Sequence, residues 1–253
     1  MTNIDWCIDY LKEINNINEN ISLKKEDALR ALMNITMPYD LSDEFYSKQD
    51  KALLEIRNKR ELIDVESLPF IKNKISLFKG DITLLKADAI VNACNEKLLG
   101  CFVPLHGCID NAIHSYAGLE VRRDLLKIMN EQGHDEPNGK AKITKGYNLP
   151  SKFIIHTVGP KVFGRVTHDN EMDLYNCYIS SLRIADECRL QSIVFCSIST
   201  GIYGYPFNKA IKVALRAVNY YLENENKNLK RVVFDVFKES EYEEYYRAIK
   251  EEN

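Results

Sequence analysis

The sequence predicts an α/β protein, a three-layer α/β/α sandwich around a mixed central sheet, preceded by a helical N-terminal extension. From residue 69 onward, short runs rich in branched apolar residues alternate with longer segments of helical periodicity, which is the pattern of an α/β fold. Residues 1–68 show helical periodicity alone. We therefore expect two parts, an extension of residues 1–68 and a main domain of residues 69–253.

The extension contains three amphipathic segments. In the first two, apolar residues recur every three or four positions, and Ser22 is the expected N-cap and Pro38 the end of the second. The third runs from near Ser42 to about Ile63. The apolar stripes of the first two consist of Ile4, Cys7, Ile8, Leu11, Ile14, Leu29, Leu32 and Met33. About 65 residues make a marginal core alone, so we expect the stripes to pack on the main domain, with a separate interaction module as the alternative.

The main domain is expected to alternate between strands and helices. The main domain contains five histidines, and four of them are expected to be core or solvated side chains and not ligands. His114 and His156 fall on apolar faces of a helix and a strand, and His134 and His168 fall in loops. The expected strands are 75–78, 89–93, 143–148, 153–158, 192–197 and 232–236, and the expected helices are 111–117, 118–132, a segment around 174–185, one from about 206 and one at the C-terminus.

Composition excludes several classes of function. A formal net charge of -3 gives no electrostatic basis for binding nucleic acid or an anionic membrane. No apolar stretch approaches the ~20 residues of a membrane span, and the N-terminus lacks the basic-then-apolar pattern of a signal peptide. The seven cysteines are odd in number and scattered, which favours a reducing compartment over a disulfide framework. We expect a cytoplasmic monomer.

Polar or small residues follow three of the predicted strands. Asp81 comes after the first strand, Asn92 and Asn95 lie at the exit of the second, and the glycine-rich segment 197–206 follows a later one. Taken alone, Asp81 is typical of a turn or helix cap, and a glycine-rich segment is typical of a simple turn. Yet ligands of open α/β sheets bind beyond the carboxyl ends of the strands, and small residues let backbone N–H groups approach an anion.

A cluster with the spacing C-x4-H-x-C follows Asn95 and is formed by Cys101, His106 and Cys108. Thiolate and imidazole are the ligands that zinc prefers, and three protein ligands leave one position open for water or substrate, as in catalytic zinc sites. Two alternatives remain. The cysteines can be small buried hydrophobes, or a distant fourth ligand can close the site and make it structural.

Several motifs, in this order along the chain, resemble those of macrodomains, the ADP-ribose-binding fold. The matching motifs are GDIT at 80–83, VNACN at 91–95, IDNAIH at 109–114, GYNLP at 146–150, IHTVGP at 155–160 and SISTGIYGYP at 197–206. The resemblance covers about residues 70–250. Where most macrodomains have a glycine-rich loop, this chain has GCFVPLHGC, which is similar to the zinc-dependent branch of bacteria and fungi, whose members also carry a helical N-terminal extension.

The resemblance implies a position for each part of ADP-ribose. Asp81 would accept a hydrogen bond from the adenine amino group, helped by the backbone of Ile82. The 197–206 loop would hold the two phosphates, Tyr203 would pack by the distal ribose, and Asn95 would orient that ribose. The full implied ligand set is Asp81, Ile82, Asn95, Cys108, Ile109, Asp110, Asn111, Ser199, Thr200, Gly201, Ile202 and Tyr203.

The resemblance also implies a zinc-dependent hydrolase that removes mono-ADP-ribose from modified protein. We expect the ADP-ribose to be linked to Asp or Glu, because a carboxylate ester has a better leaving group than an arginine linkage and the motifs offer no obvious strong general acid. One zinc ion per chain and the residues Asn95, Cys101, His106, Cys108 and Asp110 would form the catalytic centre. Asp110 would fix the ribose or water, or support the metal site. A sirtuin-type transferase and a lipoylated, glycine-cleavage-H-like carrier are the implied partners. The alternatives are a non-catalytic ADP-ribose reader with structural zinc, and a phosphatase acting on ADP-ribose 1″-phosphate.

Overall fold

A seven-stranded mixed sheet forms the centre of the computed structural model, which describes residues 1–39 and 41–251. Its strands are β2 (Phe70–Lys72), β3 (Ile75–Lys79), β5 (Ala89–Cys94), β6 (Ala141–Lys145), β7 (Phe153–Val158), β8 (Ser192–Phe195) and β9 (Arg231–Val236). The spatial order is β2-β3-β9-β8-β5-β7-β6. The inner strands pair in parallel, and the edge strands β2 and β6 are antiparallel to their neighbours. The predicted mixed sheet is thus confirmed.

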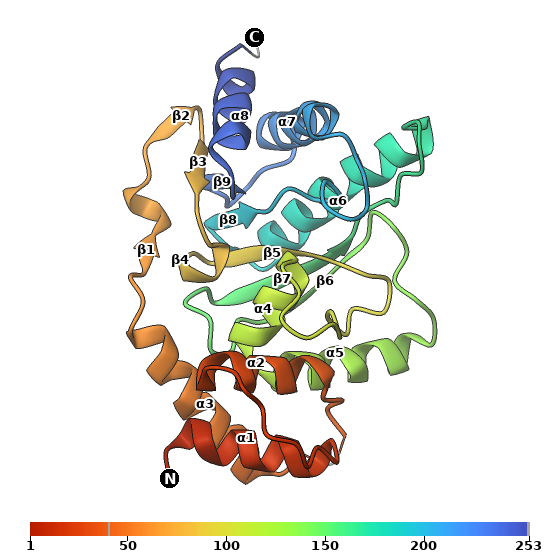
Figure 1. Cartoon of the computed structure of the whole chain (residues 1–253). Coiled ribbons are helices and arrows are strands. Elements are labelled where there is room, and N and C mark those ends of the chain that lie inside the picture. Colours follow the sequence, from red (N-terminus) through yellow and green to blue (C-terminus); the bar gives the residue numbers. More distant parts are fainter. Residues whose placement is uncertain (40, 252–253) are drawn as a thin grey trace.

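Helices cover both faces of this sheet and complete the predicted three-layer α/β/α sandwich (Figure 1). The helices of the main domain are α4 (Ile109–Ala117), α5 (Leu119–Gln132), α6 (His168–Glu187), α7 (Phe207–Asn224) and α8 (Glu239–Glu251). The first two lie on one face, and α6, α7 and α8 lie on the other. Because helices cover both faces, β8 and β9 are buried along their whole length, which explains their continuous apolar runs. No helix in the described part of the chain is long and apolar enough to cross a membrane.

Several expected boundaries in the main domain are corrected by the structure. The strand expected at 143–148 runs from Ala141 to Lys145, because Gly146 leaves the sheet and hydrogen-bonds to the carbonyl of Lys152 in a turn. His168 begins α6 instead of lying in a loop, since the Thr167 hydroxyl caps that helix. His114 and His156 are buried, as expected for core side chains, and His134 is exposed in a loop.

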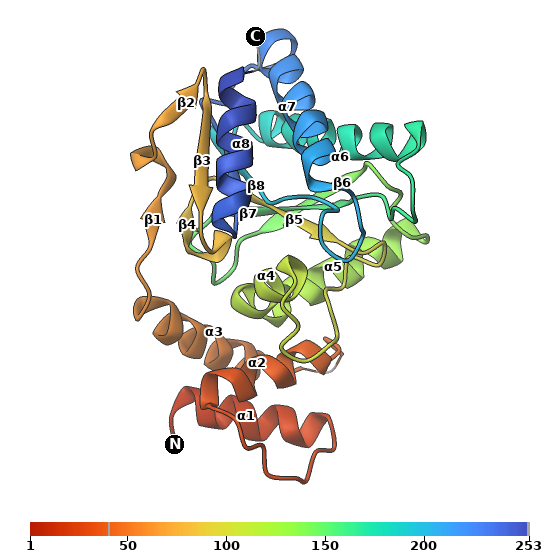
Figure 2. The same ribbon diagram turned by 45° about the horizontal axis from the view of Figure 1, so that its top comes forward.

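The extension forms three helices, α1 (Asn3–Ile14), α2 (Lys25–Ile35) and α3 (Asp43–Asn58), which gather at one end of the molecule under α4 and α5 (Figure 2). Their apolar stripes form a hydrophobic cluster that also takes in Leu119 of α5. The cluster therefore joins the extension to the main domain. The boundary at residue 68/69 stays a prediction.

Two details of the extension were predicted wrongly. Ser22 does not cap α2, which begins at Lys25 without a side-chain cap and instead has two acidic residues in its first turn; acidic residues there are favourable to the helix dipole. The third helix ends at Asn58, not near Ile63, because Ile63 pairs with Leu85 in a short parallel ladder of β1 (Ile63–Asp64) and β4 (Leu85–Lys86). The start of α3 at Asp43 agrees with the expected start near Ser42, whose hydroxyl caps the helix.

The interface between α3 and α5 contains a buried acid, Glu120, whose Oε2 accepts a hydrogen bond of 2.7 Å from Gln49 Nε2. Burial is the main cause that raises the pKa of Glu120 from 4.5 to about 7. The folded protein therefore holds a proton that the unfolded chain releases, and the free energy of unfolding should fall by about 1–3 kcal/mol as pH rises through that range.

Thermal melts of wild type and Glu120→Gln between pH 4.5 and 8 test this expectation. The variant should lose this part of the pH dependence and be more stable than wild type at pH 8. Glu131→Gln, at an exposed position of the same helix, is the matched control and should follow wild type. Parallel melting curves of wild type and Glu120→Gln across the range would contradict the expectation.

Candidate functional site

A cleft of about 690 Å³ opens beyond the carboxyl ends of the parallel strands, which is the position expected for a ligand site in such a sheet. Its walls come from the segments that follow β3, β5, β8 and β9 and from the start of α4. Of the implied ligand residues, all except Asn111 line it. Asn111 is fully buried behind the wall, where its Oδ1 accepts from Arg30 and its Nδ2 donates to the carbonyl of Val103.

One end of the cleft holds two carboxyl groups. Asp81 caps a short 3₁₀ turn, with its Oδ1 accepting from the Thr83 backbone N–H at 2.9 Å and its Oδ2 paired with Arg60 of the segment after α3. Arg60 also stacks over the ring of Tyr116 at 4.5 Å. Asp235, at the end of β9, is buried with its Oδ1 unpartnered, and burial together with the nearby Asp81 raises its pKa well above the usual range. This end therefore places an ion-paired carboxylate beside a buried carboxyl group whose neutral form is favoured by its surroundings.

The loop after β8 forms a second wall. Ser199 adopts a φ of 64°, and its hydroxyl packs so tightly on Gly159 that a Cβ there would lie 2.1 Å from Ser199 Oγ. The bond from Tyr205 N–H to the Ser199 carbonyl fixes the loop's shape. Within the described chain, the N–H groups of residues 200–203 are paired with no backbone carbonyl, and these residues face the cleft. Such a row of free donors suits an anionic ligand.

The third wall is the segment between β5 and α4, which holds Cys101, His106 and Cys108. Their ligand atoms lie within 4.8 Å of one another, and this is the sole group of three such side chains found in the described residues. Cys101 Sγ and His106 Nδ1 are 3.6 Å apart. Burial raises the pKa of the Cys108 thiol to about 12, so a nearby cation is needed to ionise it at neutral pH. The donor set fits zinc, whose bonds of about 2.0–2.3 Å place tetrahedral ligand atoms at comparable separations.

Asp110 follows the cluster in the first turn of α4 and faces the cleft. It is buried, and burial raises its pKa to about 6. Asn92 donates to Asp110 Oδ1 at 2.8 Å, and His114 Nε2 lies 3.4 Å from the same oxygen. Asn92 was expected at the strand exit, but it is fully buried within β5, where it also contacts His156. Its role is thus to hold Asp110 from behind.

The start of the cluster loop is shaped by Asn95 and Gly100. Asn95 lines the cleft, and its side chain bonds within the loop, accepting from Lys97 N–H at 3.0 Å and donating to the Gly100 carbonyl at 3.1 Å. Gly100 has a φ of 85° and lies directly on the His114 ring, so that a Cβ at Gly100 would be 2.8 Å from ring atoms. Burial and Arg122 hold the pKa of His114 well below its usual range, so this ring is neutral.

Comparisons with known proteins agree with this geometry. The Macro domain family model matches residues 91–214. A protein-ADP-ribose hydrolase of Staphylococcus aureus is 41% identical over 97% of this chain and 94% of its own length, and one of Treponema medium is 39% identical over 93% and 94%. The chain belongs to the macrodomain family. A solved Trypanosoma brucei macrodomain in complex with ADP-ribose matches 84% of this chain and 93% of its own length, with 31% identity and a TM-score of 0.67.

The sequence missed several residues of the macrodomain's cleft. Arg30, Phe102, Tyr116, Asp235 and Phe237 all line it. Phe237 had a usable signal, because it is an aromatic residue directly after a predicted strand. Arg30 had none, since it is one of several polar residues of an amphipathic helix in the extension and lies far from the other cleft residues in sequence.

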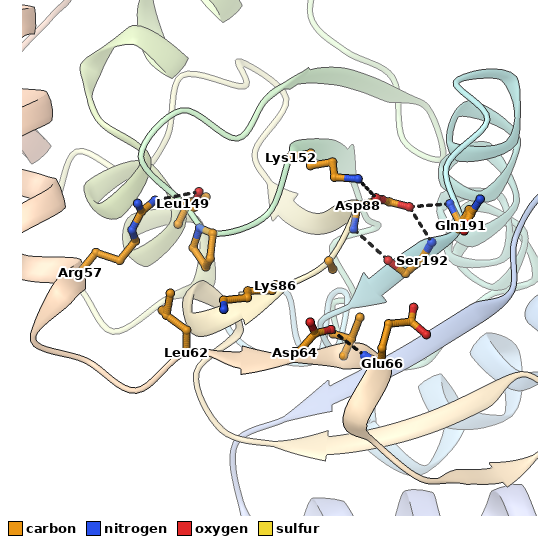
Figure 3. Close-up of a pocket in the computed structure, with 13 residues that line it drawn as sticks. Arg57, Leu62, Asp64, Glu66, Lys86, Asp88, Leu149, Lys152, Gln191 and Ser192 are labelled. Carbon is orange, nitrogen blue, oxygen red and sulfur yellow. Dashed lines mark hydrogen bonds and ion pairs between the residues drawn. The ribbon is translucent and has the colours of Figure 1, made fainter.

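A second cavity, of about 500 Å³, lies at the opposite ends of β5 and β8 (Figure 3). Two of its charged groups, Asp88 and Arg57, are engaged by the fold itself. Asp88 accepts from Lys152 at 2.7 Å and from the backbone N–H of Gln191 and Ser192, and Arg57 donates to the carbonyl of Leu149 and its neighbour. The Arg57 contacts join the extension to the main domain, and the Asp88 contacts join three segments of the main domain, so we assign this cavity a structural role.

Proposed function

We propose that this macrodomain is a hydrolase that releases mono-ADP-ribose from modified proteins, using one zinc ion per chain. The observation that carries the proposal is the opening of Cys101, His106 and Cys108 into the same cleft as Asp110. Support comes from relatives named protein-ADP-ribose hydrolase that match nearly the whole chain, including most of the extension.

The cleft offers a place for each part of ADP-ribose. The end with Asp81 and Ile82 suits adenine, since a paired carboxylate accepts a hydrogen bond from an amino group. The free N–H groups of residues 200–203 suit the diphosphate. Tyr203 and Asn95 line the same cleft and would contact the distal ribose, close to the three residues of the C-x4-H-x-C cluster. The bond to the modified protein would therefore sit beside Asp110.

Removing the Asp81 carboxylate should weaken the binding of free ADP-ribose. Loss of a hydrogen bond to a charged group costs about 1.5–3 kcal/mol, which corresponds to roughly 10–150-fold in affinity. Titration calorimetry with Asp81→Ala tests this. The matched control is Asp64→Ala, because Asp64 caps another 3₁₀ turn in the same way, outside the cleft. Equal affinities for wild type and Asp81→Ala would remove the adenine role.

The chemistry divides between the metal and the chain. Cys101, His106 and Cys108 would hold the zinc ion, which would supply a Lewis acid when bound. Asn95 and Tyr203 orient the distal ribose, and the loop at 199–203 holds the diphosphate. Asp110 orients water and accepts its proton, while Asn92 keeps the carboxyl group in place. Addition of water breaks the bond between ADP-ribose and the protein and yields free ADP-ribose and the unmodified side chain.

We infer that the scissile linkage is an ester to Asp or Glu. A carboxylate leaves as a stable anion, whereas the guanidine nitrogen of an arginine linkage needs a proton from a general acid. The test compares ADP-ribose release from Asp/Glu-modified and Arg-modified proteins, and we expect release from the former. Equal release from both would refute the ester assignment. No release from any substrate, with ADP-ribose binding intact, would instead indicate a reader.

The biological setting remains a prediction from the sequence resemblance. It comprises a sirtuin-type transferase that attaches the ADP-ribose, and a lipoylated, glycine-cleavage-H-like carrier as the modified protein. That the protein is a cytoplasmic monomer is a separate prediction, in which the scattered cysteines are the basis for the compartment. Incubating the protein with such a carrier after ADP-ribosylation tests the substrate directly. Release from generic modified proteins but not from the carrier would reject this partner while leaving the hydrolase proposal intact.

A further inference from the structure

The loop that holds the three cluster residues makes one backbone hydrogen bond within itself, from His106 N–H to the Val103 carbonyl at 3.2 Å. Residues 99–108 contain no helix or strand, and within it Leu105 adopts a φ of 56°, which a branched side chain adopts only at a cost in free energy. Leu105 directly precedes His106. The position of the imidazole therefore depends on contacts from outside the loop.

Helix α2 of the extension supplies those contacts. Asn34 Oδ1 accepts a hydrogen bond of 3.0 Å from the Leu105 backbone N–H, at the strained residue itself. Arg30 Nη2 donates to the carbonyl of His106 at 3.3 Å. Arg30 also donates to Asn111 Oδ1 through Nε and Nη2, at 3.1 and 2.6 Å, and Asn111 in turn donates to the Val103 carbonyl. One helix thus holds the loop on both sides of His106.

A buried arginine extends this network below the loop. Arg122 of α5 is 1% exposed and donates from Nε to the Leu99 carbonyl at 2.7 Å. Its Nη1 donates to the carbonyls of Met33 and Asn34 at the end of α2. The guanidinium also stacks on the ring of Phe102, within the loop, at 4.3 Å. The beginning of the loop and the end of α2 are therefore tied to one side chain.

We propose that α2 is part of the metal site. Arg30 is its positioning residue and holds His106 and the first turn of α4 in the geometry that metal binding requires. This inference rests on the zinc site proposed above and assigns the extension a role in it. A metal site tolerates only small displacements of its ligands, and groups that orient ligands commonly change metal affinity by about 10–100-fold. Arg30 suits this role because its planar fork reaches two acceptors at once.

The test compares wild type, Arg30→Ala, Arg30→Lys and Lys25→Ala. Lys25→Ala is the matched control, since Lys25 begins the same helix and pairs with Asp5 within the extension. Zinc affinity is measured by chelator competition, and ligand geometry by the visible absorption of the cobalt-substituted protein. Arg30→Ala should bind zinc about 10–100-fold more weakly and show an altered cobalt spectrum. Arg30→Lys should give partial rescue, and Lys25→Ala should match wild type.

Thermal melts show whether each variant is folded. If Arg30→Ala does not fold, the zinc affinity and cobalt spectrum of Arg30→Lys alone test the role of α2. Wild-type zinc affinity and cobalt spectrum in a folded Arg30 variant would overturn the role of α2, with the zinc site itself intact. Wild-type protein that binds neither zinc nor cobalt would overturn the metal site first and this inference with it. A shift in ADP-ribose affinity without a change in metal binding would also count against the inference.

Discussion

His106→Ala should leave the protein folded but unable to retain zinc, and should lower the rate of ADP-ribose release by about 10³-fold or more. The expected size follows from the several kcal/mol by which a metal ion stabilises developing charge, at 1.4 kcal/mol for each tenfold in rate. Wild type should contain about one zinc per chain, because the cluster provides a single set of three ligands. Cys101→Ala and Cys108→Ala should behave in the same way.

Metal analysis, thermal melts and single-turnover release, run on the same preparations, check this expectation. His134→Ala is the control, since His134 is an exposed loop histidine away from the cluster. Chelated wild type should lose activity and recover it when zinc is added. Wild-type rates from folded, zinc-free His106→Ala would exclude metal catalysis and leave the zinc, if present in wild type, with a structural role.

Asp110→Asn should retain zinc and ADP-ribose binding yet lose about 10²–10⁴-fold in turnover, which is the usual contribution of a positioned acid or base. The amide can keep the hydrogen bond that Asn92 donates, because it still presents an oxygen acceptor. It cannot accept a proton from water. The loss should therefore fall on kcat, with little change in KM.

Steady-state kinetics on an Asp/Glu-modified protein separate these quantities, and Asp169→Asn, at an exposed position in the first turn of α6, is the control. A variant that has lost zinc would show that Asp110 supports the metal site. A variant with raised KM and unchanged kcat would show that it fixes the ribose. Either result would replace the assignment of Asp110 as proton acceptor.

The sequence was informative where the signal is local. β7 was predicted at its full length, and β5 within one residue, because a strand covered on both faces needs a short run rich in branched apolar residues. The three cluster residues could be found for a similar reason, since they lie within eight positions of one another and their types suit one metal. The short strands β1, β2 and β4 leave no such pattern in two or three residues.

The contacts between the extension and the cleft could not be predicted in this way. Arg30 and Asn111 are 81 positions apart, and nothing in either neighbourhood indicates the other. The ion pair between Arg60 and Asp81 could not be predicted either, because the sequence already explained Asp81 as a turn former without a partner. Long-range polar pairs depend on how two amphipathic surfaces meet, which periodicity alone does not determine.

The close approach of Gly100 to His114 constrains how this chain can vary during evolution. A side chain at position 100 would collide with the imidazole and would also have to adopt a backbone conformation that favours glycine. A substitution at 100 is therefore expected to be tolerated only after His114 has been replaced by a smaller residue, so that the order of the two mutations matters. Homologues should accordingly carry compatible residues at the two positions, and chimeras that exchange this loop without α4 should fold poorly.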